Sequence, residues 1–114
     1  MLYDNDGHVI TISLGDTGLT GTPSTDLFKL GYLEKLDLEQ NMIKFDFNGI
    51  EVDVKLKILY LSDSNITSIL GIGKSKTLTR LHLTNIGLSG NIPVALCDIT
   101  NHEYLYMNLN KFYK

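Results

Sequence analysis

The strongest candidates for catalytic or metal-binding side chains in this 114-residue sequence are four carboxylates and three histidines. The carboxylates are Asp16, Asp37, Glu39 and Asp63, and the histidines are His8, His82 and His102. A general acid/base pair needs positioned carboxyl groups in a site that shifts their pKa values, whereas a solvated acidic face supplies little desolvation. No histidine has a cysteine or a second histidine at the spacing of a metal site. We therefore expect a non-enzymatic protein with no metal and no cofactor.

A second group of side chains, aromatic, cationic or apolar, recurs at intervals of 22 and 24 residues. It consists of two sets, Ile58, Arg80 and Tyr104, and Tyr60, His82 and Tyr106. Tyr and Arg are enriched at the energetic centres of protein interfaces, because each combines a large contact area with a polar group. We therefore predict that these six residues form a protein-binding surface. The alternative is that tyrosine stands there because it is a good strand former on an exposed sheet face.

The intervals belong to a repeat that runs through the sequence. Aliphatic residues fill equivalent positions in segments that begin near residues 9, 33, 56, 78 and 102, in steps of 24, 23, 22 and 24 residues. Each segment is too small to bury its own apolar face, so neighbouring segments must share one continuous core. The sequence predicts a single domain over residues 1–114, built from five such segments of which the last is partial.

The clearest copy of the repeat spans residues 78–99, where the strand pattern LxxLxL at Leu78–Leu83 precedes Leu88-Ser-Gly90-Asn-Ile92-Pro93. It resembles the plant-type subfamily of the leucine-rich repeat family, LxxLxLxxNxLxGxIP, and the likeness covers about residues 8–112. The second and third copies depart from the pattern, since Ile43-Lys-Phe45-Asp-Phe47 lacks the glycine and Ile66-Thr-Ser-Ile69-Leu-Gly-Ile72 resembles the shorter 22-residue variety. The resemblance implies an α/β-type repeat solenoid. Such a right-handed coil has a parallel concave β-sheet and a mostly irregular or 3-10 convex side.

Both ends of this solenoid are expected to be uncapped. Plant-type proteins have a cysteine near the position of Tyr3 and a tryptophan-containing cap before it, and this sequence has neither. The sequence ends at Lys114, just past the fifth strand pattern. We therefore expect a fragment, a degenerate copy, or a subunit whose ends a partner covers.

The alternation LxL within each segment predicts strands with two aliphatic side chains facing inward. The pairs expected in the core are Leu36/Leu38, Leu59/Leu61, Leu81/Leu83 and Leu105/Met107. The ninth position of each segment is expected to turn inward and bond the backbone of adjacent coils. It is occupied by Thr17, Asn41, Ser64, Ile86 and Asn110. Because the isoleucine side chain has no polar group, we expect a local water or a looser turn beside Ile86.

Charge and hydropathy restrict the partners. The net charge of −3 argues against nucleic acid, and no apolar run approaches the roughly 18–20 residues that direct membrane insertion needs. No signal peptide is visible, although the plant-type resemblance implies an extracellular or lumenal protein. The single cysteine, Cys97, is expected to be a structural thiol. Asn65-Ile66-Thr67 is a sequon for N-glycosylation on an outward turn, and one such match is expected by chance in a sequence with many asparagines.

Three functions remain open. The resemblance implies recognition of a protein partner by the concave sheet face, as in receptor ectodomains and polygalacturonase-inhibiting proteins. Five short strands project a face of only roughly 300 Å², whereas a stable interface needs about 800 Å² per partner. The alternatives are therefore a structural or assembly subunit, docked in a larger complex through its open ends and convex side, and an inhibitor of a secreted hydrolase.

Overall fold

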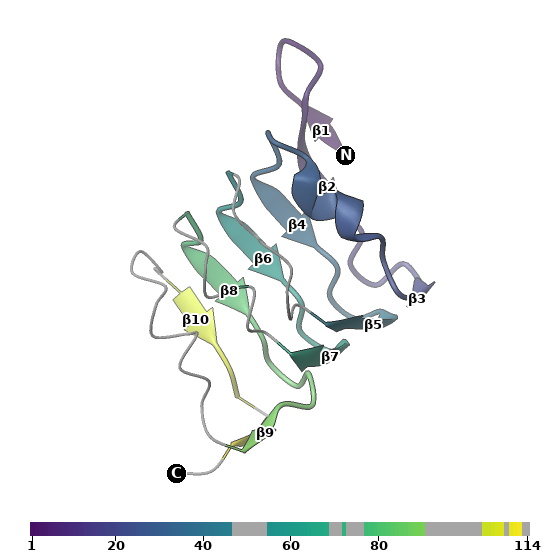
Figure 1. The fold of residues 1–114 in the computed structure, drawn as a ribbon, viewed down its shortest axis with the longest axis vertical. Coiled ribbons are helices and arrows are strands. Elements are labelled where there is room, and N and C mark those ends of the chain that lie inside the picture. Colours follow the sequence, from purple (N-terminus) through teal and green to yellow (C-terminus); the bar gives the residue numbers. More distant parts are fainter. Residues whose placement is uncertain (47–54, 69–71, 73–76, 91–103, 109, 113–114) are drawn as a thin grey trace.

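The computed structural model describes residues 1–46, 55–68, 72, 77–90, 104–108 and 110–112. Cys97 and His102 lie outside these residues. The main sheet has the order β1-β2-β4-β6-β8-β10, so its strands follow one another in space as they do along the chain (Figure 1). These strands are Leu2–Tyr3, Val9–Ser13, Lys35–Asp37, Ile58–Tyr60, Arg80–His82 and Tyr104–Tyr106. β1 is antiparallel to β2, and the strands from β2 to β10 are parallel.

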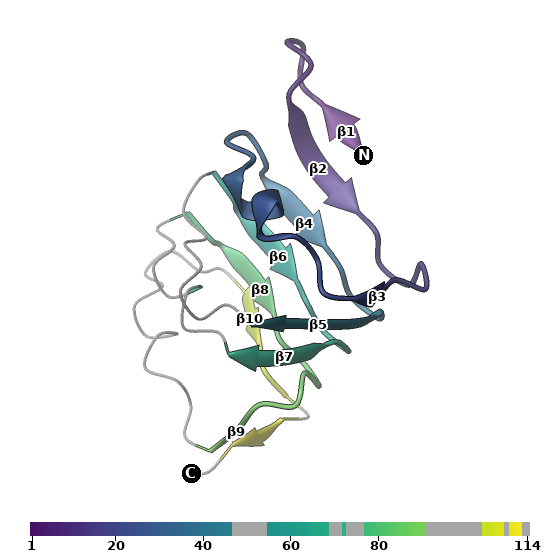
Figure 2. The ribbon, with the colours of Figure 1, turned by 45° about the vertical axis from the view of Figure 1, so that its right-hand side comes forward.

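A second layer of short strands lies across the main sheet (Figure 2). One of its sheets has the order β3-β5-β7, and a separate pair is formed by β9 and β11. The strands are Thr20–Gly21, Met42–Asp46, Asn65–Ser68, Ser89–Gly90 and Lys111–Phe112. The 3-10 helix η1, Thr25–Lys29, follows β3, and the Ser24 hydroxyl caps it by accepting a hydrogen bond from the Asp26 amide at 3.2 Å.

The core lies between the two layers, because alternate residues of each strand face inward. Leu36, Leu59 and Leu81, the middle residues of β4, β6 and β8, are fully buried. Ile43, Phe45 and Ile66 meet them from β5 and β7. The residues predicted to face inward are buried in the second, third and fourth segments, and Leu105 and Met107 are half-buried against the same cluster.

Four strands of the main sheet, β2, β4, β6 and β8, are each followed by a residue in the left-handed backbone region. These residues are Asp16, Gln40, Asp63 and Asn85, with φ between 52° and 59°. Asp and Asn tolerate this conformation better than most side chains. Their amides remain bonded to the next segment, as when Gln40 N–H donates to Ser62 O at 2.9 Å. The chain therefore reverses towards the second layer without losing its connection to the neighbouring strand.

Asn41 joins adjacent segments from within the molecule. Its Oδ1 accepts hydrogen bonds from the amides of Thr17 and Leu19, at 3.2 and 3.0 Å. Its Nδ2 donates to three carbonyl oxygens, those of Leu14, Leu38 and Glu39. One side chain thus bonds five backbone groups of two adjacent segments, with its two N–H groups shared among three carbonyl oxygens.

Asn110 makes an equivalent set of bonds at the other end of the sheet. Its Oδ1 accepts from the Ile86 and Leu88 amides at 3.1 Å, and its Nδ2 donates to Leu83 O and Met107 O. The side-chain amides of Asn41 and Asn110 therefore each bond backbone groups of two neighbouring segments.

The looser turn expected beside Ile86 is not seen at its backbone groups. Ile86 N–H donates to Asn110, and Ile86 O accepts from the Ile66 amide at 3.3 Å. The side chain is buried and belongs to the core. The Ile86 side chain makes hydrophobic contacts at the position where the second and fifth segments have an asparagine. In the third segment the residue at this position is Ser64, whose hydroxyl donates to Leu38 O.

The N-terminal residues form a hairpin that the sequence interpretation did not include. β1 pairs with β2 and so covers the edge that was expected to be uncapped. The turn is made by Asp4, whose Oδ1 accepts from the amides of Asp6 and His8, each at 2.9 Å. Gly7 supplies the left-handed residue, with φ of 84°. Side-chain bonds to local backbone therefore redirect the chain before the first repeat.

This hairpin should weaken in acid. The backbone amide of His8 holds the pKa of Asp4 below its ordinary value of 3.8, and the His8 ring and the Asp6 amide act in the same direction. Since the folded pKa is the lower one, the carboxylate stabilises the turn above the ordinary value and ceases to do so as the pH falls through the folded pKa. We expect the His8 amide resonance to shift across that acidic window in NMR spectra. An Asp4→Asn variant should show no such transition, and an identical titration in that variant would contradict the assignment.

Candidate functional site

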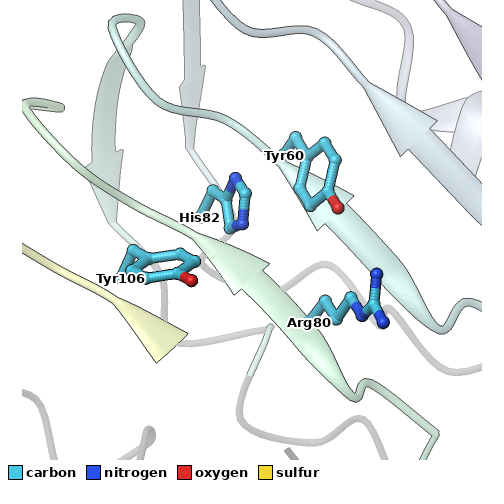
Figure 3. Close-up of a pocket in the computed structure, with 4 residues that line it drawn as sticks. All are labelled: Tyr60, Arg80, His82 and Tyr106. Carbon is cyan, nitrogen blue, oxygen red and sulfur yellow. The ribbon is translucent and has the colours of Figure 1, made fainter. Parts of the chain in front are cut away.

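The six residues predicted to bind a partner lie on β6, β8 and β10. Ile58, Arg80 and Tyr104 are register partners, and Tyr60, His82 and Tyr106 form the next set. The structure brings Tyr60, Arg80, His82 and Tyr106 together around a hollow of about 350 Å³ (Figure 3). Ile58 is half-buried and does not line this hollow. The backbone of Tyr104 pairs with Arg80, and its side chain lies outside the described part of the chain.

Three rings follow one another across the strands and form what we term the aromatic row, Tyr60, His82 and Tyr106. The Tyr60 and His82 rings are stacked, with centroids 3.9 Å apart and planes 15° from parallel. The His82 and Tyr106 rings meet edge to face, at 4.7 Å and 72°. Both geometries are favourable for aromatic pairs. Neighbouring strands are about 4.8 Å apart, so in-register side chains reach each other without leaving the sheet face.

Charged groups flank the aromatic row. The Lys35 ammonium lies over the Tyr60 ring, 5.4 Å from its centroid. Glu39 Oε2 is 3.5 Å from His82 Nδ1, and both side chains are about 25% exposed. Lys35 and Glu39 are therefore residues of the site that the sequence interpretation left out of the binding set.

The predicted carboxylate cluster is divided among separate backbone turns. Asp37 Oδ1 accepts from the Glu39 amide at 3.0 Å, and Asp63 Oδ1 accepts from Asn85 Nδ2 at 2.8 Å. Asp16 is exposed at a left-handed turn. Glu39 faces His82 instead. These carboxylates contact turn amides, a side-chain amide and an imidazole, so their positions are explained by local structure.

Asp4, Asp6 and His8 form an acidic group that the sequence interpretation did not single out. Among the described residues, their ligand atoms lie within 4.8 Å of one another. Asp4 already accepts two backbone amides through Oδ1, and its Oδ2 is 2.8 Å from His8 Nδ1. The arrangement is therefore that of a hairpin turn, and the signal in the sequence was the Asp-Asn-Asp-Gly run.

A second aromatic contact lies at the N-terminal end of the sheet. The His8 ring stacks on Tyr32, with centroids 3.7 Å apart and planes 10° from parallel. The Lys55 ammonium lies 4.7 Å from the Tyr32 centroid. Tyr32 directly precedes the second segment of the repeat, which begins near residue 33. The aliphatic pattern of the repeat predicts no role for this position. These contacts hold the N-terminal hairpin against the segment between η1 and β4.

No family model matches the chain, and no curated protein matches it either. In the part of the chain that the structure describes, there is no helix of the length and apolar character that crossing a membrane requires. The chemistry of the sheet face is therefore the basis on which a function is proposed.

Proposed function

We propose that this chain is a leucine-rich-repeat module that binds a protein partner through the face of the main sheet that points away from the core. The centre of the binding surface is the aromatic row with Arg80 beside it. The repeat intervals of the sequence support the family assignment, because they equal the intervals between register partners from Thr11 to Tyr104. The protein acts by recognition and not by catalysis.

The observation that carries this proposal is the packing of the aromatic row. Tyr60 and His82 are held by their mutual stacking, and Tyr106, 47% exposed, contacts His82 with its ring at the edge of the row. Binding costs conformational entropy for each side chain that becomes ordered. Rings that already contact one another lose less conformational entropy on binding, so this surface is preorganised for a partner.

Polar residues border the aromatic row on one side. Thr84 N–H donates to the Ser62 hydroxyl at 3.1 Å, and the Thr84 hydroxyl donates to Asn108 Oδ1 at 2.8 Å. A polar border around an apolar and aromatic centre is the usual arrangement of protein interfaces. The partner must also reach beyond the sheet face, since five short strands offer less than the roughly 800 Å² of a stable interface.

A structural subunit remains the second candidate, and a specific observation favours it. Met1, Leu2 and Tyr3 expose 58–65% of their surface on the hairpin at the end of the main sheet. Edge strands with exposed apolar side chains are prone to pair with another chain. Size-exclusion chromatography with light scattering separates the two functions. A monomer favours the recognition module, and self-association that Leu2→Lys abolishes favours the subunit.

Truncation of the two tyrosines of the aromatic row should strongly weaken partner binding. We expect the double variant Tyr60→Ala/Tyr106→Ala to bind at least about 100-fold more weakly, because truncation of a central tyrosine costs about 2 kcal/mol or more. The measurement is quantitative mass spectrometry of proteins retained by the immobilised chain from an extract of its source cells. Binding constants of the retained partner are then measured with purified components.

The matched control is Tyr32→Ala, which removes an exposed tyrosine of the same chain that lies outside the aromatic row. It should retain the partner as the unmodified chain does. Circular dichroism should show the same secondary structure in all three proteins. Equal retention by the double variant would remove the proposed surface.

A further inference from the structure

Asn65-Ile66-Thr67 lies on β7, in the second layer, and not on a turn as the sequence suggested. The segment is extended because β7 pairs in parallel with β5, where Lys44 is the register partner of Asn65. Asn65 and Thr67 are exposed, and Ile66 between them is buried in the core. Since alternate side chains of a strand point to one side, Asn65 and Thr67 share the same surface, where the Thr67 hydroxyl donates to Phe45 O at 3.4 Å.

The surroundings of Asn65 leave room for a bulky group. A hollow of about 280 Å³ adjoins it, lined in part by Met42 and Lys44 of β5 and by Asp63 and Ser64 before β7. Met42 is 81% exposed, the highest exposure among the large hydrophobic side chains that the structure describes. An unbranched thioether on an open surface offers apolar contact to whatever lies over it.

We propose that Asn65 is an N-glycosylation site and that the first sugars of the glycan lie over Met42 and Lys44. Asn-X-Thr is the acceptor sequence for this modification. The donor is a lipid pyrophosphate-linked oligosaccharide. Asn65 Nδ2 bonds to the anomeric carbon, the bond from that carbon to the pyrophosphate oxygen breaks, and the lipid pyrophosphate leaves with the electron pair. Nδ2 releases one proton to a base of the transferring enzyme.

The glycan would lie on the side of the molecule away from the aromatic row. Ile66 and Phe45, from β7 and β5, belong to the core cluster that also contains Leu59 and Leu81. The second layer is therefore separated from the outer face of the main sheet by the core. A glycan on Asn65 leaves Tyr60, His82 and Tyr106 accessible, so this inference is independent of the proposed partner binding.

The experiment expresses the full chain behind a cleavable secretion signal in a eukaryotic cell line, and examines cell-associated and secreted protein together. We expect a slower electrophoretic band that a peptide N-glycosidase removes, with conversion of Asn65 to Asp seen by peptide mass spectrometry. Asn65→Gln and Thr67→Ala should lack the slower band, and the conservative variant Thr67→Ser should retain it. The sequence has no other Asn-X-Ser/Thr tripeptide. An unmodified chain in both fractions would overturn the site.

A second measurement tests where the sugars lie. Oxidation by dilute peroxide should convert Met42 to the sulfoxide several-fold more slowly in the glycosylated chain than in Asn65→Asp, the sequence that enzymatic deglycosylation leaves. Met1, which is 65% exposed on the hairpin, is the internal reference and should react equally in both. Equal oxidation of Met42 in the two proteins would overturn the placement of the sugars over β5.

Discussion

Asn41→Asp is expected to destabilise the fold by about 3–5 kcal/mol, as for a buried charge without a compensating partner. The substitution keeps an acceptor for the Thr17 and Leu19 amides, but it replaces the amide that donates to Leu14 O, Leu38 O and Glu39 O. A carboxylate would then face three carbonyl oxygens in a position that is 4% exposed. Urea unfolding followed by circular dichroism measures the loss. A domain with total stability of 5–15 kcal/mol would be largely unfolded at the lower end of that range.

The exposed Asn5, in the hairpin turn, supplies the matched control. Asn5→Asp makes the same chemical change and should alter the free energy of unfolding by less than about 0.5 kcal/mol. Burial raises the pKa of a carboxyl group, so the folded form of the Asn41→Asp variant should regain stability as the pH falls. A variant with normal stability at neutral pH would show that the bonds of Asn41 do not hold the segments together.

Leu59→Ala should produce the second large effect, a loss of about 2–5 kcal/mol. Leu59 is fully buried in the middle of β6, with Leu36 and Leu81 as its register partners on either side. Truncation removes apolar surface and leaves a cavity that the flanking strands, fixed by backbone bonds to β6, can close only in part. The midpoint of urea unfolding measures the change.

Met42→Ala is the comparison for this variant, since Met42 is 81% exposed on β5. It removes a side chain of similar size from the surface and should change stability by no more than about 0.5 kcal/mol. Similar losses in the two variants would mean that the main sheet does not enclose the core described above.

The alignment of the strands could be predicted from the sequence because one pattern repeats. The interval from Tyr60 to His82 equals the interval from Leu59 to Leu81, so the residues that fill the core and the residues that face outward are specified together. Period-two alternation then assigns Leu59 to the inside and Tyr60 to the outside. The composition of the candidate binding surface follows from the same reasoning.

The contacts within that surface could not be predicted in this way. Glu39 meets His82 two strands away, although the repeat aligns Glu39 with Ser62 and Thr84, and His82 with Asp37 and Tyr60. A serine is short, so the longer carboxylate can extend past it to the next ring. Such contacts depend on side-chain rotamers and on the size of the residue between, and the spacing of a repeat contains neither.

The N-terminal hairpin was missed for a different reason. The interpretation followed aliphatic positions, whereas the hairpin is formed by a carboxylate that bonds two backbone amides and by a glycine with positive φ. Asp-Asn-Asp-Gly is a turn sequence by its own chemistry. Ile86 is an aliphatic residue in a position that is usually polar; its side chain extends the core, and its own amide and carbonyl groups are bonded.

The order of the main sheet has a mechanical consequence. Strand order equals chain order, so β1 and β10 lie at opposite edges of the main sheet (Figure 1). A force that pulls the ends apart therefore acts across the strands and loads the hydrogen bonds between neighbours one pair at a time. The strands would separate one after another from an edge of the sheet at low force. Each strand that separates would add the residues of one repeat interval to the extended chain. A partner that lies across several strands would clamp them together and resist that extension.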